Sequence, residues 1–282
     1  MGLVLGPVLK ALLFSFNNCP LGAPDVAVVY VPAGVRVENP IHLSYVSVEG
    51  GEEGSNKLPV SNPRVLVVVE EGGGEVGIIE EFTNKSTSTY ELVEVSTGGK
   101  LSRHNLHLQQ LGPDTSTELS TFHLSLGGQT QDLHSRLVFD HPRAYSRQLH
   151  KCIVAHSQGQ AVFDGNVKVN RYAQQTDAGQ LTRSLLLEPR ATVNVKPNLQ
   201  IIADDVKCSH GAAISDLEES QLFYFQARGI DLEMARKALV FSFGAEVIER
   251  CPYSFVRKQV ENHVKELLSS TSQGSSNAAG SG

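Results

Sequence analysis

The sequence predicts an all-β body followed by a small helical region. Strand-like segments recur from Val26 to Ile201 without one convincing amphipathic helix between them. Turns rich in glycine or proline separate these segments, as they do between the short strands of a sheet. From Ser215 onward the apolar residues change from a period of two to helical spacing, so the two regions are expected to fold differently.

Alternation and β-branched runs identify the individual strands. The early strands are expected at Val26–Val31, Ile41–Val48, Pro63–Glu70 and Val76–Phe82. Among the later ones, residues 133–139 alternate most clearly, with Leu133, Ser135, Leu137 and Phe139 on one face. A stacked antiparallel sandwich and a β-solenoid both fit this pattern. The turn spacing favours the solenoid, but no fixed repeat length decides between the two.

Composition and charge exclude several classes of function. With 40% apolar and 19% charged residues among 282, the chain has an ordinary globular composition and enough residues for a substantial core. A net charge of -6, without a cluster of Lys and Arg, argues against nucleic-acid binding. No apolar run approaches the ~20 residues of a membrane-spanning helix. Residues 1–12 are apolar but lack the charged lead of a signal peptide.

The four cysteines, Cys19, Cys152, Cys208 and Cys251, are widely spaced and form no Cys-x-x-Cys pair. This spacing predicts reduced thiols in a reducing compartment rather than a disulfide framework. Cys152 stands two residues after His150, and we interpret it as a half-buried core cysteine rather than as half of a ligand pair.

Cys208 and His210 are the candidate metal ligands. They stand two residues apart, at the junction between the β body and the helical region. On an extended strand both side chains project from the same face, with Cβ atoms about 6–7 Å apart. A thiolate and an imidazole on one face could share a metal ion or a sulfur atom. The alternative from the residues alone is a buried structural cysteine.

The remaining histidines of the β body are interpreted as solvent-facing or hydrogen-bonded. They are His104, His107, His123, His134, His141, His150 and His156. No Ser-His-Asp set, nucleotide motif or pair of catalytic carboxylates is recognisable, so the chain is not expected to be an enzyme on its own. Asp204 and Asp205 are adjacent, and on a strand they would point to opposite faces.

Three short helices are expected after the β body. Ser215 to Glu218 resembles a capping box for the first helix. Gly229 is expected to end that helix in the left-handed backbone conformation. Asp231 caps the second helix, and Ser254 begins the third. The expected organisation is a lead-in (1–24), a β core (25–212), a helical domain (213–268) and a tail (269–282) that is disordered or was added for expression.

Several motifs occur in order and together resemble one known family. They are VPAGV at 31–35, QQTDAGQLTRSL at 174–185, KPNLQI at 196–201, ADDVKCSHGA at 203–212, LFY at 222–224 and ARGI at 227–230. This set resembles the SufB/SufD family of iron–sulfur cluster assembly proteins over about residues 20–265. Gly211, where the SufB branch usually carries glutamate, resembles the SufD branch, and residues 214–230 look most like its plant plastid members.

The resemblance implies a right-handed parallel β-helix with a C-terminal helical domain, and so favours the solenoid. It also implies an accessory or scaffold subunit, without catalysis of its own, that pairs with a SufB-like scaffold and docks a SufC-like ATPase, which hydrolyses the ATP. A homodimer is expected in isolation, and the plastid stroma is the implied location. The family's usual upstream helical region is missing, which implies a truncated chain.

By the same resemblance, Cys208 and His210 are the interface candidates for a transient iron–sulfur cluster or iron shared with the partner. The two residues supply only two of the roughly four ligands that such a centre needs, so the others must come from another chain or from sulfide. The candidate contacts of the helical domain with the ATPase are Phe223, Tyr224, Arg228, Gly229 and Ile230.

Two alternatives come from other classes of protein. The first is a secreted-type β-helix polysaccharide lyase or hydrolase, which Asp204 and Asp205 could suggest. The second is a purely structural homodimer in which Cys208 is merely buried. We also expect that removing residues 215–268 abolishes ATPase binding and leaves the β body largely intact.

Overall fold

The computed structural model describes residues 78–80, 88–251 and 254–269 with their side chains. For the other parts of β1 to β6, and for residues 270–278, it describes the backbone element alone. The strands are β1 (Val4–Leu5), β2 (Leu9–Phe14), β3 (Val26–Val31), β4 (Ile41–Tyr45), β5 (Arg64–Val69), β6 (Glu75–Asn84), β7 (Thr89–Thr97), β8 (Leu101–Gln110), β9 (Ser116–Ser125), β10 (Thr130–Phe139), β11 (Tyr145–Val154), β12 (Gln160–Val169), β13 (Thr176–Leu186), β14 (Thr192–Ile201) and β15 (Val206–Ser215). Three helices follow: α1 (Glu219–Gln226), α2 (Leu232–Ile248) and α3 (Ser254–Ala278).

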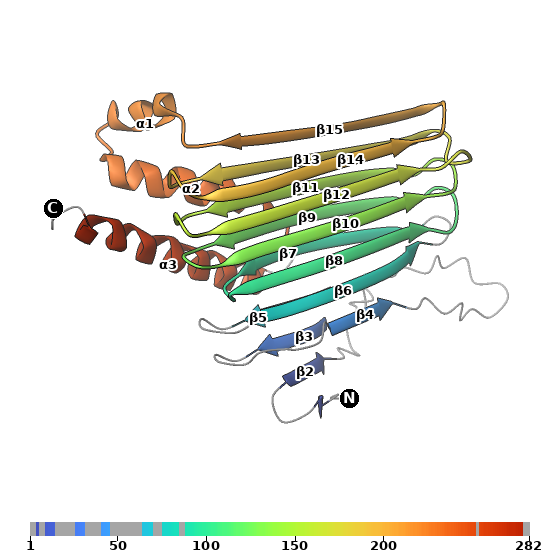
Figure 1. Ribbon diagram of the computed structural model, residues 1–282, viewed down its shortest axis with the longest axis horizontal. Coiled ribbons are helices and arrows are strands. Elements are labelled where there is room, and N and C mark those ends of the chain that lie inside the picture. Colours follow the sequence, from blue (N-terminus) through green and yellow to red (C-terminus); the bar gives the residue numbers. More distant parts are fainter. Residues whose placement is uncertain are drawn as a thin grey trace.

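Two parallel sheets form the β body (Figure 1). One has the strand order β14-β12-β10-β8-β6-β4 and the other has the order β15-β13-β11-β9-β7. Successive strands alternate between the sheets, and each strand pairs in parallel with the strand one coil earlier. The chain therefore winds as a parallel β-helix, which confirms the solenoid and excludes the antiparallel sandwich for these strands.

The coils differ slightly in length, which explains why the sequence shows no fixed repeat. Interactions between equivalent positions of neighbouring coils span 29 residues between Arg103 and Asp132 and 32 residues between Gln148 and Gln180. The strands keep nearly constant length, so the turns absorb the difference. Hydrophobic alternation therefore persists in each strand, while its spacing along the chain drifts.

The N-terminal strands form a separate four-stranded sheet in the order β1-β2-β3-β5. In this sheet β1 pairs with β2 and β2 with β3 in antiparallel fashion, whereas β3 and β5 are parallel. The expected lead-in (1–24) thus contributes β1 and β2, and β3 is not stacked simply as one more coil. Each antiparallel pair of this sheet includes β2, whereas the described strand pairs within residues 25–212 are parallel.

The interior of the solenoid is built from alternate residues of each strand. In β10, Leu133, Ser135, Leu137 and Phe139 are all buried, as their spacing predicts. Strands β9 and β11 are buried along both faces for most of their length. Burial on both faces places apolar residues on both sides of these strands.

Helices α2 and α3 cover the outer face of the five-stranded sheet. Phe122 and Leu149 project from β9 and β11 into a core that also contains Val240, Val247 and Val264 from the helices. Burial of this apolar surface binds the helical region to the solenoid. The helices and the outer face of this sheet therefore share one apolar cluster, distinct from the clusters inside the solenoid.

Close contacts at this interface explain why particular residues are needed. A Cβ added to Gly244 would lie 2.6 Å from Cζ of Phe122, so only glycine allows α2 to approach the sheet this closely. The buried Lys151 ammonium donates to the carbonyl oxygen of Phe243 at 2.9 Å and forms an ion pair with Glu246. This partnering satisfies a charge that would be costly to bury alone.

The helix ends agree with the sequence at three of four positions. Asp231 caps α2, its Oδ1 accepting from the Met234 backbone N–H at 2.9 Å. Gly229, at φ +79°, lies in a Schellman-type turn in which Ile230 N–H donates to the carbonyl of Phe225 at 3.2 Å. Helix α3 begins at Ser254 as expected.

The expected capping box at residues 215–218 is wrong. Ser215 is the last residue of β15, where it pairs with Leu185, and Glu218 stands at the N-cap of α1 without a side-chain capping bond. Strand pairing along β13 continues through Ser215 and delays the helix. Helix α3 extends past Leu268 to Ala278, so it overlaps the segment expected to be a tail. Within the described residues, no helix combines the length and apolarity needed to cross a membrane.

Candidate functional site

Cys208 and His210 lie on the inward-facing row of the last coil. In the parallel register, Cys208 pairs with Ala178 and His210 with Gln180, and both of these β13 residues are buried inside the solenoid. The period of two therefore places both candidate ligands on the same face, over the interior. Cys208 is partly buried against the interior core, whereas His210 is exposed.

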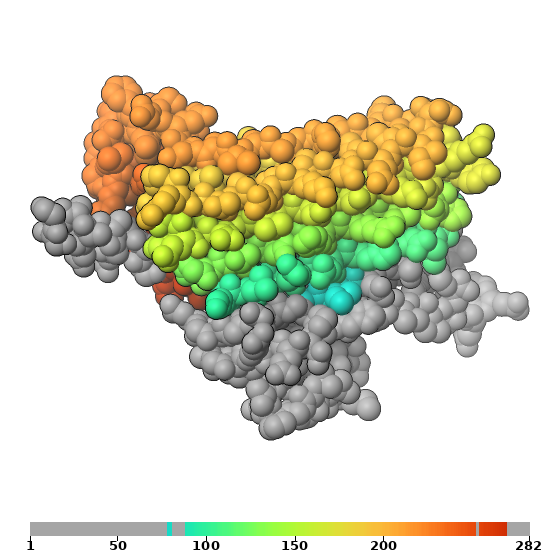
Figure 2. Space-filling model, in the orientation of Figure 1, coloured from blue at the N-terminus to red at the C-terminus, as the bar shows by residue number. Residues whose placement is uncertain are grey.

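This last coil is an open end of the solenoid. Strand β15 is the terminal strand of its sheet and β14 is the terminal strand of the other, so among the described strands neither has a neighbour on its outer edge. Figure 2 shows the coil along the upper margin of the molecule. Ile201, Ile202 and Ile214 are about half exposed there (45%, 54% and 52%). An exposed apolar sheet end of this kind is a surface for another chain.

Burial raises the pKa of the Cys208 thiol above its ordinary value, an effect that the nearby Asp177 carboxylate reinforces and a backbone hydrogen bond with Ala178 opposes. The thiol is therefore largely protonated at neutral pH. A metal ion or an electropositive neighbour has to displace this proton before the sulfur can act as a ligand.

Cys208 and His210 fit part of a metal or cluster site. Within the part of the chain that the structure describes, no group of three or more His, Cys, Asp or Glu side chains is arranged to hold a metal ion. The soft thiol and the imidazole are suitable donors for iron or a cluster, but they supply two ligands only. Two donors are fewer than the roughly four that a tetrahedral metal or an iron–sulfur cluster needs.

A buried charged cluster lies deeper in the solenoid, and the sequence did not reveal it. The imidazole of His104 lies between two carboxylates, with Nδ1 2.8 Å from Glu94 Oε2 and Nε2 3.1 Å from Glu80 Oε2. The second oxygen of Glu94 lies 3.0 Å from His123 Nε2, and Tyr90 donates to Glu80 at 2.8 Å. These residues come from four strands, so only the register of the coils brings them together.

The charges of this cluster stabilise one another. Burial alone would lower the pKa of His104, but the Glu94 charge and the hydrogen bonds to Glu80 and Glu94 raise it to about 10. Burial alone would raise the pKa of Glu94, but the charges of His104 and His123 and the hydrogen bonds to both hold it well below its usual range. His104 and Glu94 therefore form an ion pair at neutral pH.

His150 and Cys152 both face the interior. Burial and the neighbouring His123 charge lower the pKa of His150 well below its ordinary value, although Glu94 acts in the opposite direction. Its ring stacks on Phe163, and Nδ1 lies 2.8 Å from Thr121 Oγ1. Cys152 is a core residue as predicted, but it is completely rather than half buried, and burial raises its thiol pKa to about 12.

The other histidines are distributed as expected between hydrogen-bonded and outward positions. His104 and His107 lie on opposite faces of β8, the former buried and the latter half-buried. His107 and His134 line a shallow outward pocket of about 290 Å³ together with Arg136. Nδ1 of His156 accepts from the Gln158 backbone N–H at 3.1 Å. His141 uses its backbone N–H to bond Gln110.

Asp204 and Asp205 do not lie on a strand. They occupy the turn between β14 and β15, where the Asp205 backbone N–H donates to Oε1 of Gln174 at 2.8 Å. The expectation of opposite strand faces is therefore wrong. The two residues lie in a loop because the chain must turn here before β15 can pair with β13.

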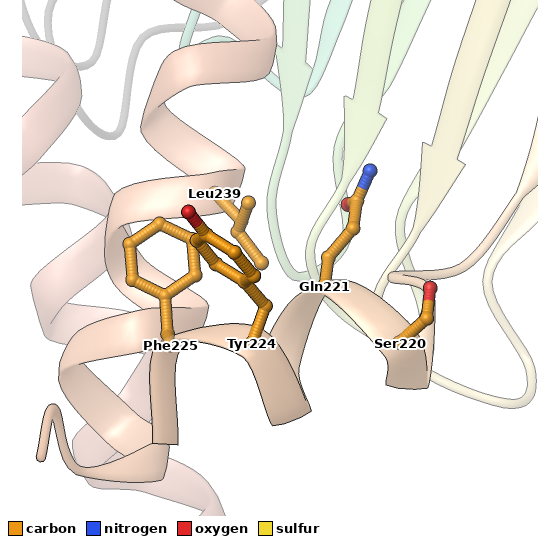
Figure 3. A pocket seen from close by; sticks show the side chains of 5 residues that line it. All are labelled: Ser220, Gln221, Tyr224, Phe225 and Leu239. Carbon is orange, nitrogen blue, oxygen red and sulfur yellow. The ribbon is translucent and has the colours of Figure 1, made fainter. Parts of the chain in front are cut away.

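The candidate docking residues of the helical domain are largely exposed. Phe223 and Tyr224 of α1 are 71% and 54% exposed, and the Arg228 guanidinium stacks over the Tyr224 ring at 3.5 Å. Gly229 is exposed and Ile230 half-buried. Figure 3 shows the Tyr224 and Phe225 rings beside Leu239 of α2, in a pocket of about 420 Å³. Helix α1 buries none of its own residues.

Comparison with known proteins identifies the family. Residues 83–243 match the model of the SUF system FeS cluster assembly, SufBD core domain. This segment covers more than half of the chain and extends from β6 into α2. The chain belongs to the SufBD family. The description of that family's model refers to iron–sulfur cluster assembly by the SUF system.

Individual relatives of this SufBD protein agree with that assignment. The chain is 61% identical to "Protein ABCI7, chloroplastic" of Arabidopsis thaliana, over 91% of this chain and 63% of the relative. It is 34% identical to a SufBD family protein of Synechocystis, over 86% and 64% of the two chains. It is 35% identical to SufD of Escherichia coli, over 61% and 40%. The chain thus spans less than two thirds of the length of each of these curated relatives.

Proposed function

We propose that this SufBD protein is a SufD-type accessory subunit whose last coil completes a cluster-handling site together with a SufB-like scaffold. One observation carries the proposal: Cys208 and His210 share the inward row of a terminal coil that has a free sheet edge among the described strands. Two ligands at an open end require further donors from outside the chain. The iron–sulfur cluster, or its iron, is cargo that passes through this junction.

The exposed apolar residues at the open end support pairing with another solenoid. Ile201, Ile202 and Ile214 surround the coil that carries the ligand pair, so an added coil would cover apolar surface and pair the free edges at once. A SufB-like chain is the proposed partner in the cell. In isolation, a second copy of this chain is expected to occupy the same end.

A strand-matched set of variants tests this site. Cys208→Ala and His210→Ala alter the inward row of β15, and Ser209→Ala alters the outward row between them. Each variant is co-expressed with SufB- and SufC-like partners and incubated anaerobically with iron and sulfide, and visible charge-transfer absorption is followed. Loss of absorption in the first two variants only, with co-elution unchanged, is expected. Full cluster formation by both variants would refute the ligand role.

The same experiment separates the alternatives. A purely structural homodimer predicts normal cluster formation in all three variants, because Cys208 would then only fill space. A polysaccharide lyase predicts activity on a polyuronate without any partner. The proposed subunit has no catalytic activity of its own, and the ATPase partner hydrolyses the ATP.

Helix α1 and the turn that follows it are the proposed docking surface for a SufC-like ATPase. Phe223 and Tyr224 are exposed on α1 and Arg228 is exposed in the turn after it, and the Arg228–Tyr224 stack holds these two side chains together. Gly229 and Ile230 form the turn behind them. Phe223→Ser and Arg228→Ala should weaken co-elution of the ATPase. Lys237→Ala, on the exposed side of α2, is the control that should not.

The plastid is the proposed compartment. A relative with 61% identity is described as chloroplastic, and widely spaced free cysteines suit a reducing environment. A fluorescent fusion of the full-length precursor tests this location directly, and a signal confined to the cytosol would contradict it.

A further inference from the structure

Three successive inward residues of β13 carry buried polar atoms without a protein partner. Gln180, Thr182 and Ser184 are 3%, 0% and 1% exposed. Within the described residues, Gln180 Oε1, Thr182 Oγ1 and Ser184 Oγ have no hydrogen-bond partner. The large majority of buried side-chain polar atoms in natural proteins have a hydrogen-bond partner, so three on one strand require an explanation.

The register places these atoms directly beneath the last coil. Gln180 pairs with His210, Thr182 with Ala212 and Ser184 with Ile214. The coil below contributes Gln148, His150 and Cys152 at the same positions. Of these neighbours, Gln148 forms a side-chain hydrogen bond to the set, since its Oε1 accepts from Gln180 Nε2 at 2.9 Å. The unpartnered atoms therefore lie between the last coil and the buried cluster.

The facing sheet places a small side chain opposite Ser184. A Cβ added to Gly165 of β12 would lie 2.4 Å from Gln180 Nε2, so these two residues face each other closely. Because both strands alternate with a period of two, Phe163 then faces Thr182 and Ala161 faces Ser184. Two of the smallest side chains thus oppose one another across an interior of about 10 Å between sheets.

We propose that the inward face of β13 binds ordered water at Thr182, Ser184 and Gln180. Buried water in proteins typically makes about three hydrogen bonds to groups that lack another partner. A hydroxyl can donate one and accept two, and the Gln180 Oε1 accepts, so the three residues provide donors and acceptors for such molecules. The site is independent of the proposed role of Cys208 and His210.

This water lies one coil inside the open end of the solenoid. The sheet edge above it is free among the described strands, so only the last coil separates this water from solvent. His123 Nδ1 is a further buried atom without a described partner, one coil below Cys152 in the row that contains Ser184.

Isosteric replacement tests the site. Thr182→Val removes the hydroxyl while keeping the shape of the side chain. If the hydroxyl binds water, its loss leaves that water short of a partner, and the midpoint of urea unfolding falls. If the hydroxyl has no hydrogen-bond partner at all, its removal relieves a desolvation penalty. The midpoint of urea unfolding then stays the same or rises. Thr121→Val, whose hydroxyl bonds His150, is the control expected to lower the midpoint.

A second measurement applies even if a variant does not fold. In the wild-type chain, water–protein nuclear Overhauser effects are measured at Thr182 and Ser184, or their surroundings are viewed in a crystal structure at high resolution. Long-lived cross-peaks, or ordered water within hydrogen-bond distance of both hydroxyls, are expected. A dry interior, or both hydroxyls bonded to protein carbonyls, would overturn the proposal.

Discussion

Nδ1 of the buried His104 lies 2.8 Å from Oε2 of Glu94 inside the solenoid. This pair joins β7 to β8, and therefore one sheet to the other, across the interior. Because both groups are removed from water, each charge depends on the other for its stability. The contact makes the stability of the β body sensitive to pH.

Stability is expected to decline as the pH rises from about 6.5 toward 10. The pKa of His104 is about 10 in the folded chain and near 6.5 when unfolded, so its contribution is complete below pH 6.5 and is lost through pH 10. Urea unfolding of the wild type at several pH values measures this loss, expected to be a few kcal/mol in total. In His104→Gln the slope over this range should largely disappear. An equal slope in both proteins would contradict the assignment.

Gly244→Ala should destabilise the chain by about 1–3 kcal/mol, the usual cost of overpacking. The added Cβ would lie 2.6 Å from the Phe122 ring, so α2 must shift away from β9. Thermal unfolding measures the effect. Ser242→Ala, an exposed replacement in the same helix, is the control and should be neutral or slightly stabilising. Equal effects of the two substitutions would mean that the close approach is unimportant.

Alkylation should distinguish Cys208 from Cys152. Cys152 is completely buried and has a thiol pKa of about 12, whereas Cys208 is only partly buried. Native protein treated with iodoacetamide at pH 8 should be modified at Cys208, more slowly than a free thiol because burial raises its pKa as well. Mass spectrometry of peptides locates the label. Modification of Cys152 before unfolding would show that the interior opens readily.

Truncation after Ser215 should not leave an intact β body in solution. Phe122, Leu149 and Ile153 pack beneath α2 and α3, so the deletion exposes a contiguous apolar face of the five-stranded sheet. The truncated chain is expected to aggregate or to bind a hydrophobic dye strongly, as size-exclusion chromatography and fluorescence would show. A monodisperse product with low dye binding would instead support an independent solenoid.

The sequence alone predicted much of the local structure. The alternation of Leu133, Leu137 and Phe139 placed them correctly in the core, and Asp231 and Gly229 marked helix boundaries. These signals are local, because side-chain direction on a strand and cap chemistry at a helix end depend on neighbours in the chain. The capping box at Ser215 failed because pairing with β13, a contact between distant residues, prolongs the strand.

Residue spacing by itself put Cys208 and His210 on one face, and motif resemblance identified the family. Only the tertiary structure decided that this face lies over the interior of a terminal coil, and that Glu80, Glu94, His104 and His123 meet below it. The physical reason is the winding of the chain. Each coil stacks on the previous one through turns of unequal length, so which residues become neighbours depends on a register that no local pattern records.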